Sequence, residues 1–188
     1  MLPVLLVTID SIVADGLHSY AVGHPGFVAV MQTWTDVFGP WTFRAILTVV
    51  AGWLWWRGRH RVAVWTFGAA VLSVVLDVGL KAVIGRPRPH WTDPVSTAVG
   101  SSFPSGHALT SFVGCGILLA LAWPALGRGA RWMWSIVAAL VSVGTGFTRL
   151  ALGVHFLSDV LGGWLVAAAL VAAMLLVLQR IPSPELRK

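Results

Sequence analysis

The sequence predicts an all-α, polytopic transmembrane helix bundle, in one membrane-embedded domain that covers residues 1–188. Two observations support this fold class. The chain is 57% apolar, and only 11% of its residues are charged, against about 25% in a typical soluble domain. Residues 94–127, 132–148 and 160–179 contain no Asp, Glu, Lys or Arg. Stretches of about 20 apolar residues are long enough to cross a bilayer as helices.

Five segments are expected to span the membrane: residues 38–56, 62–83, 104–123, 132–149 and 156–179. The first two contain charged residues. We expect Arg44, near the start of the first, to extend its charged end to the membrane–water interface. Asp77 and Lys81 are one helical turn apart near the end of the second, so we expect them to pair. The pair is either part of a functional site or a buried ion pair alone.

The net charge of +6 is distributed as membrane topology requires. Most cations lie in three segments that a five-span bundle places on one side: Arg57, Arg59, Arg61, Arg128, Arg131, Arg180, Arg187 and Lys188. The positive-inside rule makes this side cytoplasmic, and tryptophans flank the same loops as an interfacial belt would. The distribution argues against nucleic acid as a partner and places residues 84–103 outside.

Residues 1–40 contain three aspartates and no Lys or Arg. Their apolar stretch, residues 2–9, is too short to span a bilayer. We expect this segment to lie along the outer surface as an amphipathic piece, unless the chain lacks most of a preceding span. His18, Tyr20 and His24 either contact a substrate there or are ordinary interfacial residues, and the second alternative is favoured.

A histidine and an aspartate lie at the start of the last expected span. His155 and Asp159 are four residues apart, so they share a helix face. The carboxylate can accept a proton from one ring nitrogen, which fixes the tautomer and leaves the other nitrogen as a nucleophile. Ionisable groups at membrane depth are usually functional, although the two can also form a self-satisfied buried polar pair.

The segment Pro104-Ser105-Gly106-His107 begins the third expected span. Ser102 or Ser105 is expected to cap this helix, and the first amides of a helix form an anion site. Gly106 lets the backbone approach a phosphate closely. His107 lies just inside this end, where it can donate a proton to a leaving oxygen. On its own the segment also fits a plain helix start.

Four cationic residues are expected on the outer side, where the positive-inside rule predicts few: Lys81, Arg86, Arg88 and Arg149. A transferring phosphoryl group spreads negative charge over its equatorial oxygens, and catalysis is largely positioning and electrostatic stabilisation. Guanidinium groups match these oxygens with paired hydrogen bonds. The pattern therefore predicts an anion site that serves phosphate-ester cleavage at a membrane surface.

The first two motifs resemble signatures of the type 2 phosphatidic acid phosphatase family, the lipid phosphate phosphatases. The first signature is a lysine, six intervening residues and then Arg-Pro, and Lys81 with Arg88-Pro89 matches it. The second is Pro-Ser-Gly-His, which residues 104–107 match without change. Each motif is short, so neither is specific alone.

The third signature of this family reads Ser-Arg, five residues, His, three residues and Asp. Here Thr148-Arg149 is followed by His155 and Asp159 at the same spacing, and threonine keeps the hydroxyl of the usual serine. Three signatures in order, at the ends of expected membrane helices, are highly specific together. The resemblance covers residues 81–159 in detail and the other spans only in pattern.

The resemblance implies a role for each matched residue. It implies that His155 is the nucleophile and forms a phosphohistidine, that Asp159 orients it, and that His107 is general acid and then general base. The residues implied to bind the phosphoryl oxygens are Lys81, Arg88, Ser105, Gly106 and Arg149. Family members commonly have six helices and act on the outer or lumenal side, so a first helix is either missing here or reduced to residues 1–9.

No metal or other cofactor is expected. Four cations can neutralise a phosphoryl group without magnesium, and no further cluster of Asp, Glu or His is available to hold an ion. Cys115 is the only cysteine, so neither an intrachain disulfide nor a cysteine metal site is predicted.

Three functions are compatible with these features. The first is an integral-membrane lipid phosphatase at the outer face of the cell membrane, which acts on a polyprenyl diphosphate, phosphatidic acid or phosphatidylglycerol phosphate. The second is an enzyme resembling the vanadate haloperoxidases, but the long apolar runs disfavour it because those proteins are soluble. The third is a lipid-phosphate-binding or transport protein without turnover, which the two histidines and the aspartate disfavour because binding alone needs no nucleophile.

Overall fold

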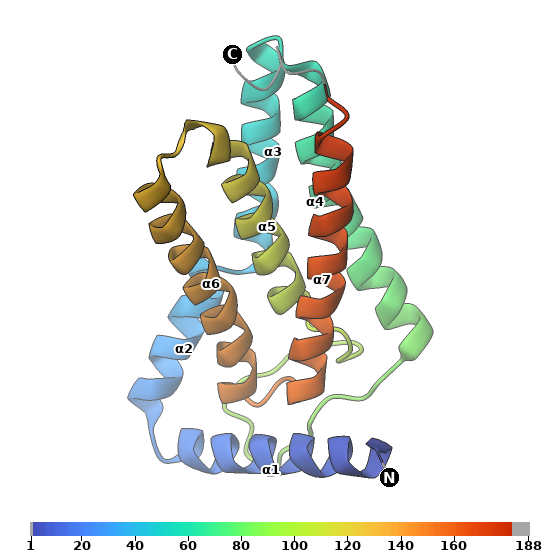
Figure 1. The fold of residues 1–188 in the computed structure, drawn as a ribbon. Coiled ribbons are helices and arrows are strands. Elements are labelled where there is room, and N and C mark those ends of the chain that lie inside the picture. The colour runs from blue at the N-terminus through green and yellow to red at the C-terminus, as the bar shows by residue number, and fades with distance from the viewer. Residues whose placement is uncertain (1, 182–188) are drawn as a thin grey trace.

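The computed structural model describes residues 2–181, and every regular element in this range is helical (Figure 1). The elements are α1 (Leu2–Val22), α2 (Pro25–Val37), α3 (Pro40–Trp56), α4 (His60–Ile84), α5 (Gly106–Ala122), a short 3-10 turn (Trp123–Ala125), α6 (Arg128–Ala151) and α7 (Leu157–Leu178). Met1 and residues 182–188, which include Arg187 and Lys188 of the basic tail, lie outside the described residues. Six stretches of the described chain are long and apolar enough to cross a membrane. The predicted all-α membrane bundle is confirmed.

The five predicted spans correspond to α3 to α7. Pro40 at the first position of α3 has a fixed φ that suits a helix start. Gly85 ends α4 with a φ of 62°, a left-handed conformation that favours glycine. Helix α5 packs against α3, α4, α6 and α7, and its residues Leu109, Val113 and Ile117 are fully buried in the core. Because α5 is packed on all these sides, its first turn is held in place. This turn carries Gly106 and His107 of the second motif.

The expectation for residues 1–40 was incomplete. Residues 2–9 are the first part of a 21-residue helix rather than a short apolar piece, and α2 follows it. Figure 1 shows α1 lying across the end of the bundle, roughly at right angles to α6 and α7. Its Leu6 and Ile12 are exposed whereas Asp10 and His18 are buried. An exposed apolar face on a helix in this orientation is typical of a segment that lies in the membrane interface, one of the two alternatives predicted.

Residues 85–105 form an irregular segment between α4 and α5, as the predicted helix breakers require. Arg88 organises this segment, because its Nε donates to the carbonyl of Gly100 at 3.0 Å and its Nη2 donates to those of Val99 and Ser101 at 3.2 Å. The Trp91 indole donates to the carbonyl of Gly153 at 2.8 Å. The segment is thereby held against the short turn between α6 and α7.

Candidate active site

A polar cavity of about 330 Å³ contains residues from all three motifs. The motif residues that line it are Lys81, Arg88, Gly106, His107, Arg149 and His155. The rest of the lining comes from the α2–α3 junction, α4 and the irregular segment: Thr35, Asp36, Gly39, Pro40, Trp41, Arg44, Asp77 and Ala98. Motifs that are far apart in sequence therefore share one cavity.

His155 lies in the turn between α6 and α7, and its side chain is only 3% exposed. Nδ1 is 3.4 Å from Oδ2 of Asp159, and Nε2 is 3.0 Å from Nη1 of Arg88. A guanidinium can only donate, so Nε2 must be the acceptor nitrogen and the ring proton belongs on Nδ1, beside the carboxylate. This tautomer places the reactive lone pair on the nitrogen that faces Arg88.

The surroundings keep the His155 imidazole neutral. Its pKa is lowered from 6.5 to about 4, chiefly because burial disfavours the imidazolium. The charges of Arg88 and Arg149 act in the same direction, whereas Asp159 opposes the shift. At neutral pH the Nε2 lone pair is therefore available to attack an electrophile.

Asp159 is fully buried at the start of α7 and is held from two sides. Its Oδ2 accepts the backbone N–H of Phe156 at 2.8 Å, and its Oδ1 accepts from Nη1 of Arg86 at 2.7 Å. Because both oxygens are engaged, the carboxylate has one orientation, with Oδ2 toward His155. The predicted proximity of His155 and Asp159 is confirmed.

Arg86 does not join the cations that line the cavity, so its predicted grouping with them is wrong. Its Nη1 binds Asp159 and Ser158 Oγ, the latter at 2.6 Å, and its Nη2 binds Oδ2 of Asp10 at 2.7 Å. Asp10 lies on α1, is 3% exposed, and also accepts the backbone N–H of Ser158 at 2.8 Å. Arg86 therefore ties the surface helix α1 to the carboxylate that lies behind His155.

The first turn of α5 places His107 and Gly106 at the cavity wall. A Cβ on Gly39 would lie 3.7 Å from Nε2 of His107, so this ring nitrogen is next to the start of α3. A Cβ on Gly106 would come within 2.7 Å of Oδ2 of Asp77. Glycine is therefore the residue that fits between the α5 start and the α4 carboxylate without a shift.

The serine cap predicted for α5 is wrong in detail. Ser105 does occupy the N-cap position, but its side chain makes no capping hydrogen bond. The residue is fully buried, and within residues 2–181 its Oγ has no hydrogen-bond partner. Ser102 is not the cap either, because its Oγ donates to the carbonyl of Pro87 at 3.0 Å. The expected contact of Ser105 with phosphoryl oxygens stays a prediction.

The other cations are held differently. Lys81 pairs with Oδ1 of Asp77 at 2.7 Å, as the spacing of four residues predicted. Arg149 is 6% exposed, and its Nη1 donates to Oγ1 of Thr35 on α2 at 3.1 Å. Arg44 lines the cavity, a position that the sequence analysis did not predict, and its expected extension to the interface stays a prediction. The position of Arg44 in an apolar span is the sequence signal that could have placed it at the cavity, because charges at membrane depth usually face a functional site.

Three aromatic or histidine residues in α1 and directly after it lie outside the cavity. His18 stacks on Trp91 with ring centroids 3.9 Å apart, and Tyr20 stacks on His24 at the same distance. None of the three α1-region residues His18, Tyr20 and His24 lines the cavity. The favoured alternative, that they are packing or interfacial residues, agrees with this arrangement.

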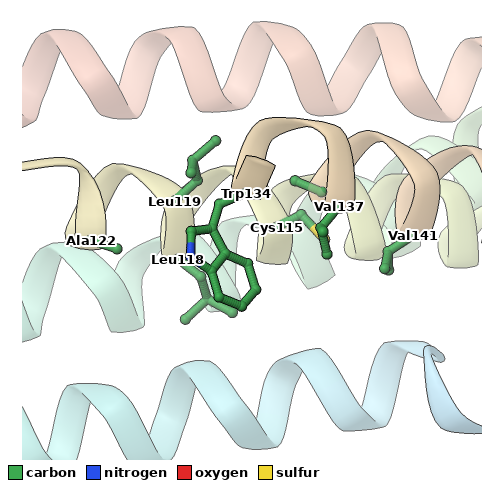
Figure 2. Close-up of a pocket in the computed structure, with 8 residues that line it drawn as sticks. Cys115, Leu118, Leu119, Ala122, Trp134, Val137 and Val141 are labelled. Atoms are coloured by element: carbon green, nitrogen blue, oxygen red, sulfur yellow. The ribbon is translucent and has the colours of Figure 1, made fainter. Parts of the chain in front are cut away.

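A second cavity of about 330 Å³ between α5 and α6 is apolar (Figure 2). Its lining consists of Cys115, Leu118, Leu119, Ala122, Trp134, Val137, Ala138 and Val141. It contains no residue of the three motifs, so the polar cavity is the candidate active site.

A model of the PAP2 superfamily matches residues 62–182, more than half of the chain. The chain belongs to the PAP2 superfamily. The predicted resemblance to the type 2 phosphatidic acid phosphatases is thus confirmed. The matched region contains all three motifs of the polar cavity, which is hereafter called the PAP2 site.

Curated relatives of this PAP2 protein are all named as phosphatases. It is 34% identical to phosphatidylglycerophosphatase B of Bacillus subtilis (strain 168) over 93 residues, and this match covers 48% of this chain and 45% of the relative. It is 32% identical to undecaprenyl-diphosphatase of Sulfolobus acidocaldarius over 103 residues, which are 52% of this chain and 46% of the relative. It is 33% identical to lipid A 4′-phosphatase of Rhizobium leguminosarum over 117 residues, which are 54% of this chain and 48% of the relative. The chain spans about half the length of these curated relatives.

Two solved structures share the fold of this PAP2 protein. The transmembrane PAP2-type phosphatidylglycerolphosphate phosphatase from Bacillus subtilis matches with a TM-score of 0.75 and 24% identity, over 96% of this chain and 98% of the other. Aquifex aeolicus LpxE matches with a TM-score of 0.62 and 20% identity, over 81% of this chain and 87% of the other. The first match includes nearly the whole chain, so the helices that precede the PAP2 motifs also belong to the shared fold.

Proposed function

We propose that this PAP2 protein is an integral-membrane lipid phosphatase that cleaves a phosphate monoester or diphosphate of a lipid through a phosphohistidine intermediate. The observation that carries the proposal is the setting of His155. The imidazole is buried and neutral, its Nδ1 is beside Asp159, and its Nε2 faces the cation Arg88 in a polar cavity. The names of the curated relatives support phosphate removal as the reaction.

In the first step Nε2 of His155 attacks the phosphorus atom. Arg88 exchanges its contact with Nε2 for a phosphoryl oxygen, and Lys81 and Arg149 neutralise the remaining charge. The bond between phosphorus and the lipid oxygen breaks. His107, whose protonated form is favoured once the negative charge of the phosphate is bound beside it, gives its proton to that oxygen. Asp159 stabilises the positive charge that develops on the phosphorylated ring.

In the second step water hydrolyses the phosphohistidine. His107 is now neutral and takes a proton from the attacking water. The bond between phosphorus and Nε2 breaks, its electron pair returns to the ring of His155, and inorganic phosphate leaves. His107 is protonated again and His155 is neutral, so the cycle closes without a cofactor.

Purified protein should release inorganic phosphate from at least one of a polyprenyl diphosphate, phosphatidic acid and phosphatidylglycerol phosphate, and excess chelator should leave the rate unchanged. The site cations supply the charge that a metal would otherwise supply. Residues 2–181 contain no group of three or more His, Cys, Asp or Glu arranged to hold a metal ion. His155→Ala is the inactive control.

Three other outcomes would contradict this function. Loss of activity with chelator and its return with magnesium would exclude the cation-based mechanism. Binding of lipid phosphates without any release of phosphate would favour the transport or binding alternative. Halide oxidation with added vanadate, without phosphate release, would favour the haloperoxidase alternative.

We also propose that the PAP2 site opens to the outer face of the cell membrane. Figure 1 shows the α3–α4 and α5–α6 connections at the end of the bundle opposite α1. Basic residues lie in these connections or in the first turn of the helix that follows: Arg57, Arg59, Arg61, Arg128 and Arg131. Since basic loops stay in the cytoplasm, the α1 end belongs outside.

A cysteine at the exposed residue Thr97 should react with a membrane-impermeant thiol reagent in intact cells. The Thr97→Cys change is made in a Cys115→Ala background, so that one thiol is present. Ala125→Cys, at an exposed residue of the α5–α6 connection, is the matched control and should react only after permeabilisation. The reverse labelling pattern would place the PAP2 site in the cytoplasm.

A further inference from the structure

One end of the PAP2 site is formed by the α2–α3 junction, which lies outside the three family motifs. Asp36, Gly39, Trp41 and Arg44 line this end. Figure 1 shows that α3 begins farther from α1 than α7 does, part-way along the bundle. The site therefore extends from His155, directly before α7, toward the interior of the bundle at the start of α3.

Arg44 brings a guanidinium to this end, and its ion pair in the described part of the chain is long and shared. Nη2 lies 3.9 Å from Oδ2 of Asp77, whereas Lys81 approaches Oδ1 of the same carboxylate to 2.7 Å. Asp36 is engaged by Gln32, whose Nε2 donates to it at 2.8 Å. The buried Nε of Arg44 has no hydrogen-bond partner within residues 2–181. A partly buried guanidinium in this state is suited to an anion that enters the cavity.

The location of His107 identifies which part of a substrate would reach Arg44. Nε2 of His107 faces Gly39, directly before α3. In the proposed reaction this histidine protonates the leaving oxygen, so the leaving group lies between His107 and the first turn of α3. Arg44 lies in the next turn of α3 and lines the same cavity. The group next to the scissile phosphoryl, on its lipid side, therefore passes close to Arg44.

We infer that Arg44 forms a second anion subsite, which binds a phosphate that stays on the lipid after the terminal phosphoryl group has been transferred to His155. This inference rests on the proposed function and narrows its substrate class to lipids with a second phosphate beside the scissile one. A lipid diphosphate and a glycerol-linked phosphodiester with a terminal phosphate share this chemistry. Phosphatidic acid, with one phosphate, lacks the group that Arg44 binds.

Two matched pairs of substrates test the subsite. One pair is farnesyl diphosphate and farnesyl monophosphate, and the other is phosphatidylglycerol phosphate and phosphatidic acid with the same acyl chains. Arg44→Gln should lower kcat/KM by roughly 10- to 100-fold for the two-phosphate member of at least one pair, the usual range for a charge-assisted hydrogen bond. For the one-phosphate member the change should be small. The pair that responds identifies whether the subsite takes a diphosphate or a phosphodiester.

Two further variants complete the test. Arg44→Lys should restore part of the preference for two-phosphate over one-phosphate substrates, because lysine keeps the charge and loses the paired geometry. Arg57→Gln removes a cation from the opposite end of α3 and should leave both substrate pairs unaffected. An equal loss on one- and two-phosphate lipids after Arg44→Gln would overturn the subsite while leaving the proposed function intact. A wild-type protein that hydrolyses none of the four lipids would overturn the proposed function itself.

Discussion

The His107→Ala variant should release about one nitrophenol per protein molecule from p-nitrophenyl phosphate in a rapid burst and then stall. Nitrophenolate is a good leaving group that departs without a proton, so the first step does not need His107. In the proposed mechanism the second step does need it, because the same side chain takes a proton from the attacking water. A covalent intermediate therefore accumulates, and burst kinetics are its signature. The measurement is stopped-flow absorbance with the enzyme at micromolar concentration.

Removal of the other histidine separates the two roles. His155→Ala should show neither a burst nor a steady rate with any substrate, because no atom is left to accept the phosphoryl group. On a lipid phosphate, His107→Ala should also be inactive, since the alkoxide needs the proton that this residue supplies. A burst in His155→Ala together with its absence in His107→Ala would reverse the two assignments.

The pH dependence of the burst gives a second test of His155. Its pKa of about 4, against an ordinary 6.5, means that protonation removes the nucleophile only as the pH falls through about 4. The phosphate monoester itself takes up a proton at about pH 6. The logarithm of the burst rate constant at low substrate should therefore fall with a slope of one between these two pH values and with a slope of two below them. A slope of two directly below pH 6 would contradict the lowered pKa.

The membrane spans could be predicted from sequence because the signal is local. An uninterrupted apolar stretch of the right length needs no knowledge of its neighbours, and α3 to α7 appear where such stretches lie. Helix α1 escaped prediction because Asp10 and His18 interrupt its apolar run. Both face the protein, while apolar residues such as Ile12 face outward. That reversal of polarity makes sense only once the partners of the buried residues are known.

Part of the site could likewise be predicted from local sequence, and part could not. The three motifs fix the spacing of residues within a turn or a helix, and this was enough to predict that His107, Arg149 and His155 share a cavity. The direction of Arg86 and the contribution of Arg44 depend on how α1 and α3 pack against the motif helices. Asp10 lies 148 residues before Ser158, and no local spacing relates them. Contacts of this kind follow from tertiary packing alone.

Arg86→Gln should slow formation of the phosphohistidine on the order of 10- to 100-fold, the range seen when the hydrogen-bond partner that orients a metal-bound histidine is removed. Arg86 contacts no part of the cavity, but its fork holds Oδ1 of Asp159 at 2.7 Å and Oδ2 of Asp10 at 2.7 Å. Without this cation two buried carboxylates lose their shared partner, and Asp159 is no longer fixed toward His155. The KM for lipid substrates should change little, because the cations proposed to bind the phosphate, Lys81, Arg88 and Arg149, are untouched.

The burst distinguishes this positioning role from a general loss of folding. In a His107→Ala background the burst amplitude counts intact sites and the burst rate reports their geometry. Arg86→Gln should lower the rate while the amplitude stays near one per molecule, and Arg86→Lys should recover part of the rate. Asp10→Asn, which leaves the contact between Arg86 and Asp159 in place, should have the smaller effect of the two. A reduced amplitude with an unchanged rate would mean that Arg86 supports only the stability of the bundle, because the surviving molecules would then present His155 as well as the parent does.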